Sequence, residues 1–175
     1  DGGLSSPTRG IFAGGATYGP PGNYPSYLDT QVIDYVTIAS RGNAIQFGNL
    51  LHNTGWGMGK CSNSTRGLFA SGYNNSPAAA YQSQISYITI ATLGDTTDFG
   101  DVMVARSYIA GMASPTRAVF AGGGPGPINL IEYVTISSLG DAKDFGDMTS
   151  VKNQVQGTSD VHGFVEANLP GFMSH

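Results

Sequence analysis

Short apolar segments that end in small residues recur along the chain. The first reads Thr-Arg-Gly-Ile-Phe-Ala-Gly-Gly at residues 8–15, and closely similar segments return at residues 65–72 and 116–123. A short apolar run closed by small residues is typical of a buried β-strand that ends in a tight turn. We therefore expect one buried strand in each of the three segments.

Two further segments follow each of these strands in the same order. One is a run of β-branched and aromatic residues, which favour strands, and the next contains a Phe-Gly pair. A fourth, less regular strand is expected later in each repeat. The β-branched and aromatic runs lie at residues 33–40, 85–92 and 131–138, the Phe-Gly segments at 46–49, 98–101 and 144–147, and the fourth strands at 57–62, 109–114 and 155–158.

The spacing of these segments predicts the architecture. Tyr35, Tyr87 and Tyr133, at equivalent positions of the three repeats, are 52 and 46 residues apart. A repeat of about 50 residues built from strands is typical of propeller blades, and kelch-type repeats are the nearest match in length. No stretch has the apolar spacing of a helix, so we predict an all-β fold with blades of four antiparallel strands.

We expect a single domain of three blade repeats, because 175 residues are enough for one domain with a real core. The repeats span about residues 8–64, 65–115 and 116–158, and residues 159–175 form a closing strand or tail. The large apolar residues of the repeated strands should be buried: Phe12, Phe69, Phe120, Ile38, Ile90 and Ile136. The single cysteine, Cys61, aligns with Met112, which favours a buried apolar role over a reactive one.

Composition narrows the classes of function. Only 11% of the residues are charged, and the net charge is −4, which argues against nucleic-acid binding because a basic face is needed there. No apolar run is long enough to span a bilayer, so we expect no membrane insertion. The chain starts at Asp1 rather than Met, which leaves both a processed precursor and part of a longer protein open.

The connection after the first strand of each repeat varies most in length. From the closing glycine to the tyrosine of the next strand, it takes 20, 15 and 10 residues. The first two connections are rich in tyrosine, which offers large contact area at a small entropy cost, among Asn, Ser, Gly and Pro. These tyrosines either form a contact surface or anchor the loops; they are Tyr18, Tyr24, Tyr27, Tyr73 and Tyr81. Trp56 is either a platform for a sugar ring or a core residue.

Charged residues give no catalytic or metal site. Aspartates recur at three-residue spacing in the second and third repeats, but amides replace them in the first, so we favour turn formation over calcium binding. Arg9, Arg66 and Arg117 recur once per repeat, either as an anion-binding ring or, in the reading we favour, as structural braces. The histidines lack metal-ligand spacing, and no catalytic triad context is present. We expect no enzyme activity and no cofactor.

The three segments together resemble a known repeat family. The order of an apolar run with Gly-Gly, a tyrosine strand and Phe-Gly-Asp followed by Arg106 or Lys152 resembles a kelch-type blade. It is more similar to a degenerate kelch-like repeat of tailed-phage proteins, especially those of cyanophages, and of aquatic metagenomes. The resemblance covers nearly the whole chain and implies a structural and adhesive β-propeller in a virion or outside the cell. It implies no activity.

The resulting functional hypothesis is a non-enzymatic structural and recognition propeller. It would contact a host surface or neighbouring subunits through its tyrosine-rich loops; a glycan-binding lectin and a subunit of a self-assembling extracellular fibre are the alternatives. Three blades are too few to close a propeller, which usually has four to eight. We therefore expect a homo-oligomer, either a two-chain six-bladed ring or a head-to-tail fibre, in which each C-terminal strand near residues 155–165 completes the partner's first blade.

Overall fold

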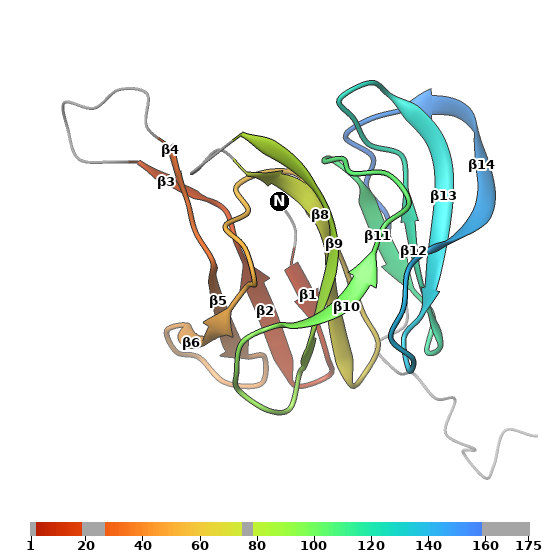
Figure 1. The fold of residues 1–175 in the computed structure, drawn as a ribbon. Helices are drawn as coiled ribbons and strands as arrows, with labels where there is room; N and C mark the ends of the chain where they lie inside the picture. Colours follow the sequence, from red (N-terminus) through yellow and green to blue (C-terminus); the bar gives the residue numbers. More distant parts are fainter. Residues whose placement is uncertain (1–2, 19–26, 75–78, 159–175) are drawn as a thin grey trace, which may run out of the picture.

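The computed structural model describes residues 3–18, 27–74 and 79–158. These residues form fourteen β-strands and no helix (Figure 1), so the prediction of an all-β fold is confirmed. Tyr24 and the tail at residues 159–175 lie outside the described residues, as do the side chains of Tyr18 and Tyr27.

Twelve strands form three antiparallel sheets of four strands each. Sheet 1 contains β1 (Gly3–Ser5), β2 (Arg9–Ala13), β5 (Val32–Thr37) and β6 (Ile45–Asn49). Sheet 2 contains β7 (Gly59–Ser62), β8 (Arg66–Asn74), β9 (Ala80–Thr89) and β10 (Thr97–Asp101). Sheet 3 contains β11 (Ala110–Ala113), β12 (Arg117–Ala121), β13 (Ile128–Thr135) and β14 (Lys143–Lys152). The two other strands, β3 (Ala16–Tyr18) and β4 (Tyr27–Asp29), form a hairpin between β2 and β5.

The repeated segments of the sequence occupy equivalent strands of the three sheets. The apolar runs form β2, β8 and β12, the tyrosine runs form β5, β9 and β13, and the Phe-Gly segments lie in β6, β10 and β14. The register is also repeated, because the tyrosines Tyr35, Tyr87 and Tyr133 pair with Ile11, Leu68 and Val119. The sequence repeat is therefore a repeat of one four-stranded sheet.

The sheets are offset from the repeats as counted along the sequence. The less regular strands expected at residues 57–62 and 109–114 are present as β7 and β11, but each pairs with the strand that follows it. The boundaries at residues 64 and 115 therefore fall after the first strand of a sheet. The corresponding strand of sheet 1 is β1, which precedes the expected first repeat and was not among the expected strands.

This offset corrects the prediction for the C-terminal segment. Residues 155–158 are described but form no strand. The place at the edge of sheet 1 that a partner's C-terminal strand was expected to fill is occupied by β1, which pairs with β2 from Gly3 to Ser5. Sheet 1 is thus complete within one chain, and strand exchange is not needed to finish it.

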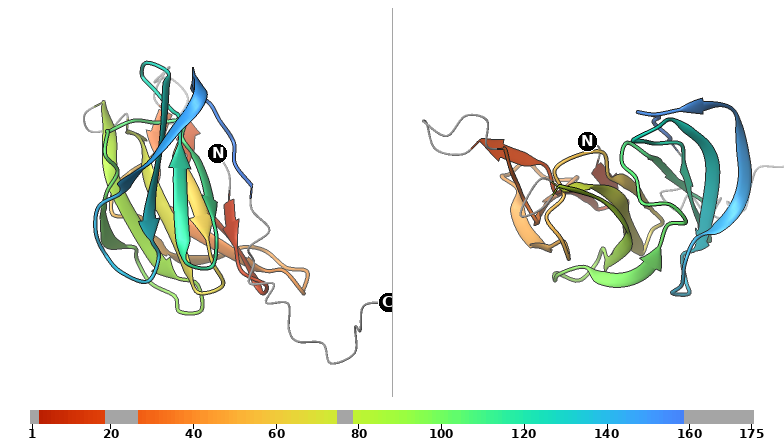
Figure 2. Two further views of the ribbon diagram at one scale, coloured as in Figure 1. Left: turned by 90° about the vertical axis from the view of Figure 1, so that its right-hand side faces the viewer. Right: turned by 45° about the horizontal axis from the view of Figure 1, so that its top comes forward.

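The three sheets stand side by side, with sheet 2 between sheets 1 and 3 (Figure 2). Their first strands lie together, because β7 contacts both β1 and β11. A Cβ atom at Gly111 of β11 would lie 2.6 Å from the carbonyl oxygen of Lys60 in β7. Only glycine allows two backbones to come this close.

Backbone hydrogen bonds join the outer parts of neighbouring sheets. Gly94 and Thr96, just before β10, donate their N–H groups to the carbonyls of Phe47 and Asn49 in β6, at 3.0 and 2.8 Å. The same pair of bonds, both 2.8 Å long, joins sheet 3 to sheet 2, from Gly140 and Ala142 to the carbonyls of Phe99 and Asp101. The Phe-Gly step is a β-bulge in each sheet, and a side chain at Gly48 would clash with the backbone of Gly94.

The hydrophobic core consists of two clusters, one in each gap between neighbouring sheets. Phe69 and Ile90 of sheet 2 pack against Phe47 of sheet 1, and Phe120 and Ile136 of sheet 3 pack against Phe99 of sheet 2. All six side chains are at most 3% exposed. Sheet 2 therefore contributes one face to the gap with sheet 1 and the other face to the gap with sheet 3.

Two residues expected in the core lie on the surface instead. Phe12 is 54% exposed and Ile38 is 56% exposed, whereas their counterparts in sheets 2 and 3 are buried. The prediction of burial was wrong for these two because the face that carries them has no preceding sheet in the described chain. Residues at this face need a neighbouring sheet to be buried, and a repeat pattern alone cannot show whether one is present.

The expected burial of Cys61 is confirmed. Its side chain is 6% exposed, and burial raises the pKa of the thiol to about 12, so the group stays a protonated, apolar core residue. In the part of the chain that the structure describes, no helix is long and apolar enough to cross a membrane.

Candidate functional site

The connections of variable length all leave the same end of the three sheets. They join β2 to β5, β8 to β9 and β12 to β13, and their described parts lie along the top of Figure 1. In sheet 1 the connection contains the β3–β4 hairpin, and in sheet 2 it extends β8 and β9 beyond their neighbours. We call this end the loop end.

A row of aromatic residues crosses sheet 2 at the loop end. Trp56 forms an antiparallel bridge with Tyr73, and Tyr73 pairs with Tyr81 across β8 and β9. Paired residues of an antiparallel sheet project from the same face, so the three side chains form a row on one side. The rings of Tyr73 and Tyr81 are 4.9 Å apart between centroids. Tyr81 is 38% exposed, while Trp56 and Tyr73 are half-buried.

A bend in β8 positions this row. The ladder between β8 and β9 shifts register between Ala70 and Gly72, and Ser71 has a φ of 62°, which is uncommon for a residue other than glycine. The Ser71 hydroxyl donates to the carbonyl of Gln82 at 2.9 Å and also contacts the carbonyl of Arg106. These contacts hold the bend, beyond which Tyr73 is paired on both sides, with Trp56 and with Tyr81.

The structure thus brings together three of the six predicted contact residues: Trp56, Tyr73 and Tyr81. Of the other three, Tyr18 and Tyr27 face each other as a backbone pair in the β3–β4 hairpin. The hairpin leaves the same end of the molecule as the row, and the side chains of these two tyrosines lie outside the described residues. Tyr24 lies outside the described residues.

Two of the three repeated arginines contact the neighbouring sheet. Arg9 and Arg66 each donate one Nη1 hydrogen to a carbonyl of the next sheet, those of Ile90 and Ile136, at 2.6 Å. Each guanidinium also stacks on the tyrosine of its own sheet, as does that of Arg117, at 4.7–4.8 Å from the ring centroid. These contacts are those of a brace between sheets, and they use part of the donor capacity that an anion would need.

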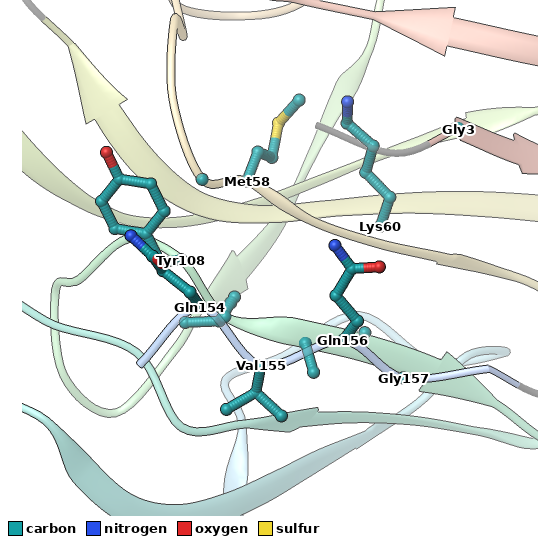
Figure 3. Close-up of a pocket in the computed structure, with 12 residues that line it drawn as sticks. Gly3, Met58, Lys60, Tyr108, Gln154, Val155, Gln156 and Gly157 are labelled. Carbon is teal, nitrogen blue, oxygen red and sulfur yellow. The ribbon is translucent and has the colours of Figure 1, made fainter. Parts of the chain in front are cut away.

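A pocket of about 240 Å³ lies between the first strands of the three sheets (Figure 3). Gly3, Lys60 and Gly111 line it from β1, β7 and β11, and Gln154 and Gln156 close one side. The Lys60 ammonium donates to the carbonyl of Ala13 at 2.9 Å. Burial lowers the pKa of Lys60 from its ordinary 10.5 to about 8. The sequence did not single out Lys60, because it lies in the least regular strand of the repeat.

A buried ion pair lies between sheets 2 and 3. Arg106 and Glu132 are 1% and 0% exposed, and Arg106 Nη2 donates to Glu132 Oε1. Arg106 also donates from Nε to the carbonyl of Gly122 and from Nη1 to that of Val104, at 2.8 and 2.9 Å. The other carboxylate oxygen accepts the N–H of Met103 at 2.7 Å. Every charged atom of the pair is therefore hydrogen-bonded.

The ion pair has counterparts in the other sheets. The backbone carbonyls of Thr54, Arg106 and Lys152 accept equivalent bonds, from Gly15, Gly72 and Gly123, so the three residues occupy one position of the repeat. Glu132 likewise corresponds to Ser86 and Asp34, because these three pair with Phe120, Phe69 and Phe12. Sequence reasoning noted Arg106 and Lys152 but missed the partner position.

Several aspartates bind backbone groups rather than one another. A carboxylate oxygen of Asp95 accepts the N–H of Asn49 at 2.8 Å, and one of Asp141 accepts that of Asp101 at 3.0 Å. Both bonds cross from one sheet to the next. Within the described ranges, no three His, Cys, Asp or Glu side chains converge in a way that could hold a metal ion.

No protein-family model matches the sequence, and no curated protein matches it either.

Proposed function

We propose that the three sheets are blades of a kelch-like β-propeller and that the chain is a non-enzymatic structural and recognition module. It would belong to a virion tail, fibre or decoration, or to another extracellular assembly, and contact a host surface or neighbouring subunits. Three observations support the blade assignment: four antiparallel strands in chain order, the same register in each sheet, and first strands that lie together.

The observation that carries the recognition role is the aromatic row of Trp56, Tyr73 and Tyr81. Its three members are fixed by pairing between strands, so binding would order few side chains and lose little entropy. Tyr81 keeps 38% of its surface exposed, and the row shares its end of the molecule with the connections that vary most in length. A rigid sheet with variable loops at one end is the usual arrangement of a recognition surface.

The alternative to a protein surface as the ligand is a glycan. Aromatic faces stack on the apolar faces of sugar rings, and the row presents three aromatic side chains in sequence. With a net charge of −4 and few charged residues, the chain would depend on such neutral contacts for binding.

Binding of the purified chain to a glycan array and to intact cells tests this proposal. Tyr81→Ser should reduce binding about tenfold or more, since interface tyrosines are common hot spots. Leu93→Ser is the matched control: Leu93 is also a large exposed residue of sheet 2, at 51%, but lies at the opposite end, between β9 and β10. Signal on the array indicates a glycan, and signal on cells alone indicates a protein. Equal binding by the two variants, or none by the parent chain, would refute the recognition role.

A further inference from the structure

Sheets 1 and 3 each leave one face without a neighbour among the described residues. The two contacts inside the chain, between sheets 1 and 2 and between sheets 2 and 3, repeat the same set of interactions. In each, the second sheet contributes a turn, two apolar side chains and a carbonyl, and the first sheet contributes an outer strand and an arginine. The open faces carry the two halves of this same set.

The first half is a backbone ladder. Gly42 and Ala44 of sheet 1 correspond to Gly94 and Thr96, which donate to the outer strand of the preceding sheet. On sheet 3 the matching acceptors are the carbonyls of Phe145 and Asp147, in the outer strand β14. A Cβ atom at the bulge glycine of sheet 3, Gly146, would meet nothing within 4 Å, whereas one at the equivalent Gly48 or Gly100 would lie 2.1 or 2.5 Å from the backbone of the following sheet.

The apolar residues show the same division. Phe12 and Ile38 of sheet 1 are 54% and 56% exposed, although their counterparts in the other sheets are buried. Phe145 of sheet 3 is 54% exposed, while Phe47 and Phe99 are 3% and 2% exposed. Three apolar positions that are buried at both internal contacts are therefore exposed only at the two open faces.

The arginine brace is also half complete. Arg117 stacks on Tyr133 as Arg9 and Arg66 stack on their own tyrosines. Arg9 and Arg66 reach the carbonyls of Ile90 and Ile136. The corresponding carbonyl for Arg117 is that of Ile38, which lies on the open face of sheet 1.

Charge is the most selective of these matches. At the two internal contacts, the position held by Thr54 and then by Arg106 faces the position held by Ser86 and then by Glu132 in the following sheet. Thr54 is opposite neutral Ser86, and cationic Arg106 is opposite Glu132. Lys152 and Asp34, at the two open faces, are again a cation and a carboxylate. Each residue thus has a partner of suitable charge in the contact that its sheet would make.

We propose that the open face of sheet 3 binds the open face of sheet 1 of a second copy of this chain, with Lys152 paired to Asp34. The contact continues an interface that the chain already makes twice internally. Two copies joined at both ends contain six sheets, which lies within the four to eight blades of closed propellers, whereas three copies would contain nine. A ring of two copies is therefore the closed assembly that this contact forms.

The ring rests on the proposed blade assignment but not on ligand recognition. Its test is the mass of the purified chain in solution, by light scattering and sedimentation. We expect twice the chain mass of 18.1 kDa. Asp34→Lys and Lys152→Asp should each weaken the dimer about 100-fold or more, since juxtaposed like charges at an interface cost several kcal/mol. Asp98→Lys, a reversal at an exposed position of sheet 2, is the control and should leave the dimer intact.

Mixing the two weakened variants makes the test specific. In a ring with one copy of each, Lys152 faces Asp34 at one contact and the two introduced charges face each other at the second. The mixture should therefore dimerise as tightly as the parent chain. A monomeric parent chain, a polymer, or a mixture no tighter than its components would overturn the proposal. If a monomer retains binding that depends on Tyr81, the ring fails while the recognition role stands.

Discussion

Removing the carboxylate of the ion pair between sheets 2 and 3 should be severely destabilising. Glu132→Leu leaves the guanidinium of Arg106, which is 1% exposed, without its counter-charge, and leaves the N–H of Met103 without its acceptor. Breaking a buried pair by removing one partner costs about 3–5 kcal/mol. Arg106 keeps its bonds to the carbonyls of Gly122 and Val104, which relieve part of the cost but do not neutralise the charge.

The second variant separates the charge from the loss of contacts. In Arg106→Met/Glu132→Leu both charges are gone and similar side-chain volumes remain, so the double variant should be more stable than Glu132→Leu alone by at least about 2 kcal/mol. Urea unfolding followed by circular dichroism gives these free energies. Asp98→Leu, which removes an exposed carboxylate of sheet 2, should change stability by no more than about 0.5 kcal/mol. If the double variant loses as much stability as Glu132→Leu and Arg106→Met lose together, the reasoning is refuted.

Two further predictions follow from burial. Phe69→Ala should lower the free energy of unfolding by about 3–5 kcal/mol, because Phe69 is buried. Phe12→Ala should lower that of the monomer by less than about 1 kcal/mol and should weaken the dimer instead. Equal losses of stability in dilute solution would contradict this. Burial lowers the pKa of Lys60 to about 8, so the folded chain loses this proton at lower pH than the unfolded chain does. Between pH 8 and 10.5 the free energy of unfolding should therefore rise with pH relative to that of Lys60→Met, by at most about 3 kcal/mol. Urea unfolding of both proteins at pH 7.5 and 10 measures this, and a constant difference would contradict it.

The strands of the repeat could be predicted from the sequence because they are local. Three kinds of segment each appear three times: apolar runs closed by small residues, runs of β-branched residues with a tyrosine, and Phe-Gly steps. The structure places each kind on an equivalent strand of the three sheets. β1 was not predicted, since three residues of Gly-Leu-Ser contain almost no strand signal. Its absence from the sequence reading shifted the repeat boundaries and suggested a strand exchange that the fold does not need.

The site could be predicted only in part, for a different physical reason. Tyr73 and Tyr81 lie eight residues apart and were both proposed as contacts, but their alignment with Trp56 depends on the bend at Ser71. The Arg106–Glu132 pair joins two sheets. It could have been found by comparing the residues that stand at the position of Arg106 and at the position of Glu132 in all three repeats. The exposure of Phe12 depends on what stands next to sheet 1, which no local pattern contains.

Cysteine crosslinking tests most directly whether the open faces bind each other. The side chains of Asn49 and Asp95 meet across the first internal contact, at 3.1 Å, and the corresponding residues at the open faces are Asp147 and Asn43. The control Asn49→Cys/Asp95→Cys should form a disulfide within one chain. For Asn43→Cys/Asp147→Cys we predict a covalent dimer and no larger product, because a ring of two copies has no free end. Only monomer after oxidation, or a ladder of products beyond the dimer, would contradict the ring.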